Sequence, residues 1–148
     1  AEPIGRGYDC GMRVAVELCK LMDRNPDMSM SDLRRALPKT YSSPTMSPWC
    51  ADTEKYATLD RIVAKLVARA EAGGSLGGRA IAQVVTVNGA RVILDNGGWG
   101  LVRASSNTPN LVVVCESPAS EAELKAIFTD LDAVIRTEPG VGDYDQTL

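Results

Sequence analysis

The fold is decided by residues 81–104, which read Ile81-Ala82-Gln83-Val84-Val85-Thr86-Val87-Asn88-Gly89-Ala90-Arg91-Val92-Ile93-Leu94-Asp95-Asn96-Gly97-Gly98-Trp99-Gly100-Leu101-Val102-Arg103-Ala104. Two turn sequences, Asn88-Gly89 and Asp95–Gly98, separate three short apolar segments. Asn-Gly between apolar segments is the strongest short-range hairpin signal, and both connections are too short for a parallel crossover. A polar stretch and another apolar segment follow. We therefore predict four antiparallel strands, at 81–87, 90–94, 99–104 and 111–115.

Two amphipathic segments flank these strands, and each predicts a helix. In 53–72, apolar residues recur at helical spacing; they are Leu59, Ile62, Val63, Leu66, Val67 and Ala70. Asp52 is a plausible N-cap for this helix, and Gly73-Gly74 ends it. A second helix, over 120–136, begins with a capping-box pattern at Ser120 and Glu123. Its stripe is Leu124, Ile127, Phe128, Leu131, Val134 and Ile135. Together the elements predict an α+β domain, a four-stranded antiparallel sheet with two helices packed on one face.

The remaining segments indicate how the chain is organised. Residues 9–24 predict a helix that Asn25-Pro26 stops, and Ser31 caps a shorter helix through Leu37. Two prolines limit 40–49 to an irregular or edge strand. We interpret residues 1–40 as a separate helical segment and 41–137 as the α+β domain. The glycine-rich stretch 73–78 is interpreted as a flexible linker, and 138–148 as a flexible tail.

The composition is that of a globular chain with an acidic balance. Its 148 residues are 45% hydrophobic and 24% charged, with a net charge of −3. A pI near 5.0 does not favour a nucleic-acid or anionic-membrane surface. No apolar run reaches the ~20 residues that span a bilayer, and no signal peptide is visible after Ala1. We therefore expect neither nucleic acid nor membrane among the partners, and a cytoplasmic location.

The titratable residues narrow the chemistry further. The chain has no histidine, and so lacks the commonest general base and metal ligand. No two of its four cysteines form a Cys-x-x-Cys pair. We interpret them as buried free thiols in a reducing compartment; they are Cys10, Cys19, Cys50 and Cys115. The start at Ala1 without Met suggests a processed chain or a fragment.

The polar stretch 103–108 has the composition of an anion site. Arg103 supplies a planar, permanently charged fork for two oxygens. Hydroxyl, amide and backbone donors can bind the other oxygens of a phosphate dianion; they come from Ser105, Ser106, Asn107 and Thr108. The same residues with Pro109 also fit an ordinary polar turn. Trp99 could stack on a sugar, but aromatic residues that open a strand more often pack under helices, and we expect it in the core.

Residues 98–109 also carry a family resemblance. They read Gly98-Trp99-Gly100-Leu101-Val102-Arg103-Ala104-Ser105-Ser106-Asn107-Thr108-Pro109. This resembles the phosphate-binding loop of the phosphohexomutases, the phosphomannomutase/phosphoglucomutase family, where Gly-Trp-x-Leu-Val-Arg leads into Ala-Ser-Asn-Thr or Pro-Ser-Gly-Thr. Gly7–Gly11 is similar to that family's aromatic-Asp-Asp-Gly, and Leu33–Ser43 to the stretch joining its third and fourth domains. The resemblance covers residues 7–136 of this chain.

The resemblance implies a C-terminal fragment of a hexose phosphomutase, comprising the end of the third domain and the fourth. The intact family enzyme interconverts hexose 1-phosphate and hexose 6-phosphate through hexose 1,6-bisphosphate, with magnesium. Its phosphoserine, magnesium and sugar-reading loops lie in earlier domains. The resemblance therefore implies no catalytic residue and no metal ligand here. It implies that Arg103 and residues 105–108 bind the non-reacting phosphate of the phosphosugar. It also implies that the other domains of the enzyme are partners of this chain.

The loop departs from the family pattern at two positions. Ser106 replaces a Gly or Asn, and Asn107 replaces a Thr. The sequence thus leaves open which of Ser106, Asn107 and Thr108 contacts phosphate. We expect the domain to close over the sugar, and the chain alone to be inactive. The alternative is a stand-alone α+β ligand-binding or dimerisation module, in which the loop is a plain turn.

Overall fold

The computed structural model describes residues 10–148, and its contacts divide the chain into two compact units, Ala1–Lys39 and Thr40–Leu148. The first unit contains helices α1, Gly11–Asp23, and α2, Met30–Arg35. Helix α1 contains no buried residue. Residues 7–9 of the motif noted above lie outside the described residues.

Helix α2 begins two residues earlier than the sequence predicted. Its N-cap is Ser29, not Ser31, because Asp32 completes a capping box. The Ser29 hydroxyl accepts from the Asp32 N–H, and the Asp32 carboxylate accepts from the Ser29 N–H. A hydrogen bond from the Ser29 hydroxyl to the Asp32 carboxylate, followed by the bonds from the Ser29 N–H and from Arg35, lowers the pKa of that carboxyl. The sequence carries the spacing that favours Ser29, because an acid, Asp32, follows it by three residues, whereas Arg34 follows Ser31.

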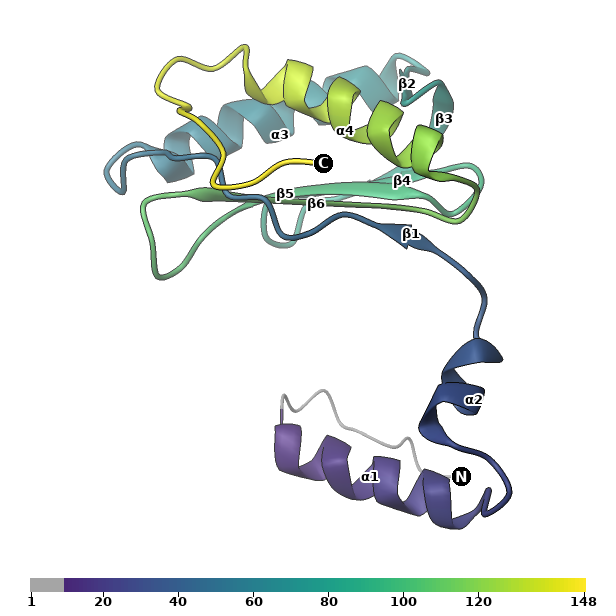
Figure 1. The fold of residues 1–148 in the computed structure, drawn as a ribbon. Helices are drawn as coiled ribbons and strands as arrows, with labels where there is room; N and C mark the ends of the chain where they lie inside the picture. Colours follow the sequence, from purple (N-terminus) through teal and green to yellow (C-terminus); the bar gives the residue numbers. More distant parts are fainter. Residues whose placement is uncertain (1–9) are drawn as a thin grey trace. The chain divides into compact units, whose positions relative to one another are not determined.

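The second unit is an α+β domain built on one antiparallel sheet of six strands in the order β1-β6-β5-β4-β3-β2. Helices α3, Lys55–Glu71, and α4, Glu121–Ile135, cover one face of it (Figure 1). The strands are β1, Tyr41–Ser42; β2, Ser75–Leu76; β3, Arg79–Val85; β4, Ala90–Leu94; β5, Trp99–Ala104; and β6, Leu111–Ser117. The fold class and the two helices on one face agree with the prediction.

The predicted number of four strands is wrong, because two-residue strands extend the sheet at both edges. Strand β1 pairs with the end of β6, with Tyr41 opposite Ser117. Strand β2 pairs with β3, with Leu76 opposite Arg79. Gly77 and Gly78 both have positive φ, +60° and +77°, so they close a tight hairpin between β2 and β3. The stretch 73–78 is therefore part of the sheet edge and not a linker.

The core lies between the sheet and the two helices. Helix α3 contributes Leu59, Ile62 and Leu66, and helix α4 contributes Leu124, Ile127, Leu131 and Ile135. All seven belong to the predicted apolar stripes, whereas Val63, Phe128 and Val134 of those stripes are only partly buried. The Ser120 cap is also confirmed, because its hydroxyl accepts from the Glu123 N–H. Asp52 does not cap α3; its carboxylate accepts from the Lys55 ammonium.

The hairpin at Asn88-Gly89 forms, but its loop is longer than the sequence suggested. Strand β3 ends at Val85, and Arg91 pairs with it. A two-residue type I′ turn needs positive φ at both central residues. Gly89 has φ +84°, whereas no described residue other than glycine has positive φ. Residues 86–89 therefore all belong to the turn, and Val87 is 93% exposed.

Residues 138–148, expected to form a flexible tail, make specific contacts with the domain. The Glu138 carboxylate is buried between Arg61 and Lys65 of α3, at 2.5 Å from each side chain. The Tyr144 hydroxyl donates to Asp132 at 2.8 Å, and its ring packs edge-on against Phe128. Tyr144 also forms an antiparallel bridge with Pro48. The tail thus closes one end of the core.

In the part of the chain that the structure describes, none of the helices has the length and apolar character of a membrane span.

The cysteine prediction is correct for only two positions. Cys50 and Cys115 are buried free thiols, whereas Cys19 is exposed and Cys10 half-buried. Burial raises the pKa of the Cys115 thiol to about 12, so this thiol is inert at neutral pH.

Candidate functional site

Arg103 lies at the end of β5, on the sheet face that the helices leave open. Along β5, residues alternate between the two faces, and Gly100, Val102 and Ala104 are buried while Trp99, Leu101 and Arg103 are half-buried. The Arg103 guanidinium donates one hydrogen bond, to the Ala104 carbonyl at 3.0 Å. Among residues 10–148 it has no carboxylate partner within ion-pair distance. An arginine without an acid partner leaves most of its donors available to an external anion.

The polar loop that follows is a compact turn organised by Ser105. The Ser105 hydroxyl lies 2.8 Å from the Thr108 hydroxyl and accepts from the backbone N–H groups of Asn107 and Thr108. The Ser105 N–H donates to the Asn110 carbonyl at 3.0 Å, which closes the loop at its base. Ser105 and Thr108 are thus brought together with two backbone donors beside Arg103. The Ser106 and Asn107 side chains are exposed at the tip and have no hydrogen bond among the described residues.

Lys55 is a contact of this loop that the sequence analysis missed. It is the first residue of α3, and its side chain is only 5% exposed. Its ammonium donates to the Thr108 carbonyl at 3.0 Å and to the Asp52 carboxylate at 2.6 Å. A signal was present in the sequence, because a helix start favours acids and disfavours a lysine. A basic residue there, three positions after an aspartate, indicates a partner outside the helix.

The segment before α3 supports the loop from the same side. The Cys50 N–H donates to the Pro109 carbonyl at 2.8 Å, and the Leu111 N–H donates to the Pro48 carbonyl at 2.9 Å. Trp49 also bridges to Asn110. The second half of the loop is therefore fixed to a chain segment about 60 residues away in sequence.

Trp99 does not pack under the helices, contrary to the expectation. Its ring lies on the open face, where the Arg91 guanidinium stacks over it at 4.2 Å. On the helix side of β5, the position of Gly100 leaves little room for a side chain. A Cβ atom on Gly100 would approach Leu131 to 3.1 Å and Ile127 to 3.4 Å. The strand therefore turns its largest side chain away from the core.

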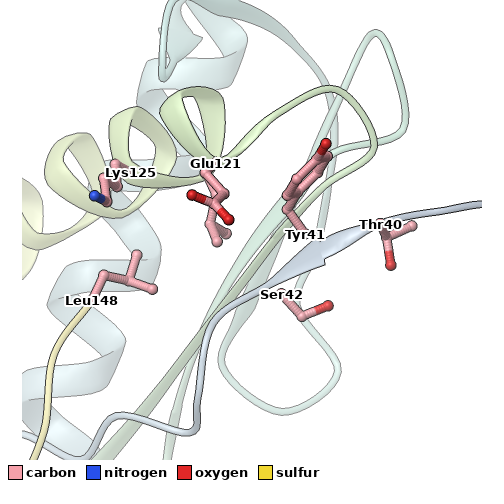
Figure 2. A pocket seen from close by; sticks show the side chains of 7 residues that line it. Thr40, Tyr41, Ser42, Glu121, Lys125 and Leu148 are labelled. Atoms are coloured by element: carbon pink, nitrogen blue, oxygen red, sulfur yellow. The ribbon is translucent and has the colours of Figure 1, made fainter.

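A pocket of different chemistry lies at the other end of β6, where β1 pairs with Ser117. Thr40, Tyr41 and Ser42 line one side of it, and Glu121 and Lys125 of α4 line another, with Leu148 below (Figure 2). Its lining side chains include one carboxylate and one ammonium, and no second cation that would attract a dianion. Neither Arg103 nor the 105–108 loop lines this pocket.

The described residues contain no group of three or more His, Cys, Asp or Glu side chains that could hold a metal ion. Several acidic side chains of the domain are paired with basic or hydroxyl groups instead. Glu123, for example, accepts from Ser117, Asn96 and Arg79. Of the contacts that lower the pKa of the Glu123 carboxyl, the hydrogen bond from the Ser117 hydroxyl has the largest effect. The residues present here do not fit a magnesium site.

The family model, the related sequences and a solved structure that match this chain all come from one enzyme family. Residues 50–134 match the family model described as phosphoglucomutase/phosphomannomutase, C-terminal domain. A phosphomannomutase/phosphoglucomutase of Pseudomonas syringae is 31% identical over 136 residues, or 85% of this chain, and one of Pseudomonas putida is 34% identical over 121 residues, or 82%. The chain spans 26% and 23% of those two proteins.

The fold is similar to that of a phosphoglucomutase/phosphomannomutase family protein from Burkholderia thailandensis, solved by X-ray crystallography. The TM-score is 0.65 at 24% identity, and the match covers 93% of this chain and 26% of that protein. The matched family model includes the end of β5, the 105–110 loop and Lys55. The chain belongs to the phosphoglucomutase/phosphomannomutase family, and residues 50–134 correspond to that family's C-terminal domain.

Proposed function

We propose that this chain binds the non-reacting phosphate of a hexose phosphate, in an enzyme that interconverts hexose 1-phosphate and hexose 6-phosphate. The observation that carries the proposal is the Arg103 guanidinium. Within the described part of the chain it has no carboxylate partner, and it lies beside a loop that gathers two hydroxyls and two backbone N–H groups. A cation next to neutral donors is complementary to a phosphate dianion.

The hydrogen bonds of the loop suggest how the anion is received. The Ser105 hydroxyl accepts from the N–H groups of Asn107 and Thr108, at 3.4 and 3.3 Å. A phosphate oxygen is a stronger acceptor than a hydroxyl and would take over these two donors. The hydroxyls of Ser105 and Thr108 would then rotate to donate to the anion. In this proposal Ser106 and Asn107, whose side chains are exposed at the tip, would also contact the anion.

A fixed phosphate anchor suits the chemistry of a mutase. The substrate reacts at one phosphoryl position while the other phosphate holds it. Binding energy from this remote group orients the reacting end and raises kcat as well as affinity. Closure of the domain over the sugar would exclude water from a reactive phosphoryl group. Magnesium, the phosphorylated serine and the bisphosphate intermediate belong, in this proposal, to other domains of the enzyme.

A titration of the labelled 148-residue chain with inorganic phosphate and with glucose 1-phosphate tests the proposal. We expect the largest NMR shifts on backbone amides of 103–108, with weak affinity. Arg103→Ala should abolish the response, because neutral donors alone bind a dianion poorly. Arg91→Ala is the matched control, since it removes a cation from the same sheet face and should leave the response intact. An unchanged response in Arg103→Ala would show that the loop is a plain turn.

A further inference from the structure

The side chain of Lys55 is placed unusually for a lysine. It is almost fully buried, at 5% exposed, although it opens α3 and its ion-pair partner Asp52 is 66% exposed. Burying an ammonium is costly, and a positive charge at a helix N-terminus opposes the helix dipole. An apolar residue would fill the same position without either cost. The lysine therefore has a use that packing does not supply.

Two successive carbonyl groups of the loop are bonded on its inner side. The Thr108 carbonyl accepts from the Lys55 ammonium at 3.0 Å and from the Asn110 N–H at 2.8 Å. The next carbonyl, of Pro109, accepts from the Cys50 N–H at 2.8 Å. Carbonyl oxygens carry partial negative charge and would repel an anion if they turned toward it. Bonded in this way, they are directed at the segment 50–55 and not at the open side of the loop.

We propose that Lys55 is a positioning residue for the phosphate loop, whose ammonium holds the Thr108 carbonyl inward so that the loop presents donors alone. The inference rests on the proposed phosphate site. Asp52 lies 2.6 Å from the Lys55 ammonium and neutralises its formal charge. Lys55 therefore acts through the loop backbone, while Arg103 supplies the charge that faces the anion.

The test compares two lysines of α3 that both form ion pairs. Lys55→Met removes the bond to the loop, whereas Lys65→Met removes an ion pair to Glu138 ten residues further along the helix. Loss of one charge-assisted hydrogen bond should weaken binding of inorganic phosphate about tenfold in Lys55→Met. It should also move the ¹³C signal of the Thr108 carbonyl. Lys65→Met should lower the melting temperature but leave phosphate affinity and that carbonyl signal unchanged. Lys55→Arg should recover part of the affinity, because a guanidinium can still donate to the carbonyl.

The outcomes separate the two proposals. If the parent chain binds phosphate at 103–108 and Lys55→Met binds equally well with an unmoved Thr108 carbonyl signal, the positioning role is wrong and the phosphate site stands. If the parent chain shows no shifts at 103–108, both proposals fail. Should Lys55→Met not fold, Lys55→Gln serves instead. Its shorter amide does not reach as far, so equal affinity in that variant would also overturn the positioning role.

Discussion

Gly89 lies directly against the backbone of Arg103. A Cβ atom at Gly89 would be 2.1 Å from the Val102 carbonyl oxygen and 2.8 Å from the Cα of Arg103. The β3–β4 turn thus packs on the end of β5 from which the guanidinium extends. Glycine is needed at this position for the close contact and also for the φ of +84°. The position of Arg103, the proposed phosphate-binding residue, is therefore set partly by Gly89 in the turn between β3 and β4.

Substitution of Gly89 should disturb both stability and phosphate binding. Gly89→Ala adds the strain of a positive φ, about 1–2 kcal/mol, and a backbone clash that costs about 1–3 kcal/mol more. Gly97 offers a matched control, because its φ is +85° and a Cβ there would meet nothing within 4 Å. Urea unfolding should show a larger loss in Gly89→Ala than in Gly97→Ala, and only Gly89→Ala should weaken the phosphate response. Equal losses in the two variants would contradict the contact with Arg103.

In the intact enzyme, Arg103 should affect both kinetic constants. Arg103→Ala is expected to raise KM and lower kcat together, because the anchor orients the substrate as well as holding it. Arg103→Lys should recover part of kcat/KM, since a point charge cannot reproduce the two-oxygen contact of a guanidinium. Steady-state assays with glucose 1-phosphate and mannose 1-phosphate measure both constants. A variant with unchanged kcat and KM would rule out an anchoring role.

The 148-residue chain alone should show no mutase activity. We proposed above that the phosphoryl-carrying serine and the metal ligands are provided by other domains, and the described residues contain no cluster that could hold a metal ion. A coupled assay of the purified chain, with magnesium and glucose 1,6-bisphosphate added, checks this. Turnover above that of the Arg103→Ala control would mean that this chain carries catalytic groups of its own.

Stability should fall in mild acid because of the Glu138 carboxylate. Hydrogen bonds from Lys65 and then Arg61 lower its pKa below the ordinary 4.5. A carboxyl whose pKa is lower in the folded state stabilises the fold above its unfolded pKa. That contribution is lost as the pH falls from 4.5 through the folded value. Glu138→Gln should therefore lower the melting temperature at pH 7, and its difference from the parent should shrink below about pH 4.

The control for this pH effect is Glu121→Gln, at the exposed first residue of α4. It should change the melting temperature little at either pH. A Glu138→Gln variant that differs equally from the parent at pH 7 and at pH 3 would show that packing, and not the ion pairs, accounts for the loss.

Hydrogen exchange should distinguish the two units. Strands β3 and β6 are held in the sheet, and β6 has strand partners along its length, so their amides should exchange slowly. Helix α1 has no buried residue, and an isolated helix of 13 residues is marginally stable in water. Its amides should exchange much faster than those of 111–115. Equal protection in α1 and β6 would mean that α1 has a stable partner.

Much of the domain could be predicted from local patterns. The turn residues at Asn88-Gly89 and Asp95–Gly98 and the stripes of α3 and α4 identified four strands and both helices. The short edge strands β1 and β2 could not be found this way, because two residues carry no alternation. They form because longer neighbours offer backbone partners.

The residues of the candidate site could be predicted from the sequence, but the contacts that hold its loop in place could not. Arg103 and the polar loop are adjacent in the sequence, whereas the contact between Lys55 and Thr108 is formed by the tertiary fold. The face of Trp99 also depended on tertiary packing. Gly100 lies so close to α4 that the small residues of β5 must face the helices. Likewise, the buried environment of Glu138 depends on α3, and the Pro and Gly residues that follow it gave no sign of it.

The C-terminal tail also bears on how the domain behaves at high concentration. On one side, residues 46–50 pair with β6 through Met46 and Val113. On the other side they pair with the tail, where the Trp49 backbone N–H donates to the Asp143 carbonyl. A chain that ended directly after α4, at Ile135, would leave those backbone groups as an open strand edge. Such edges recruit strands from neighbouring molecules. The tail therefore protects the domain against self-association, and a shortened chain would be more prone to aggregate even where its core still folds.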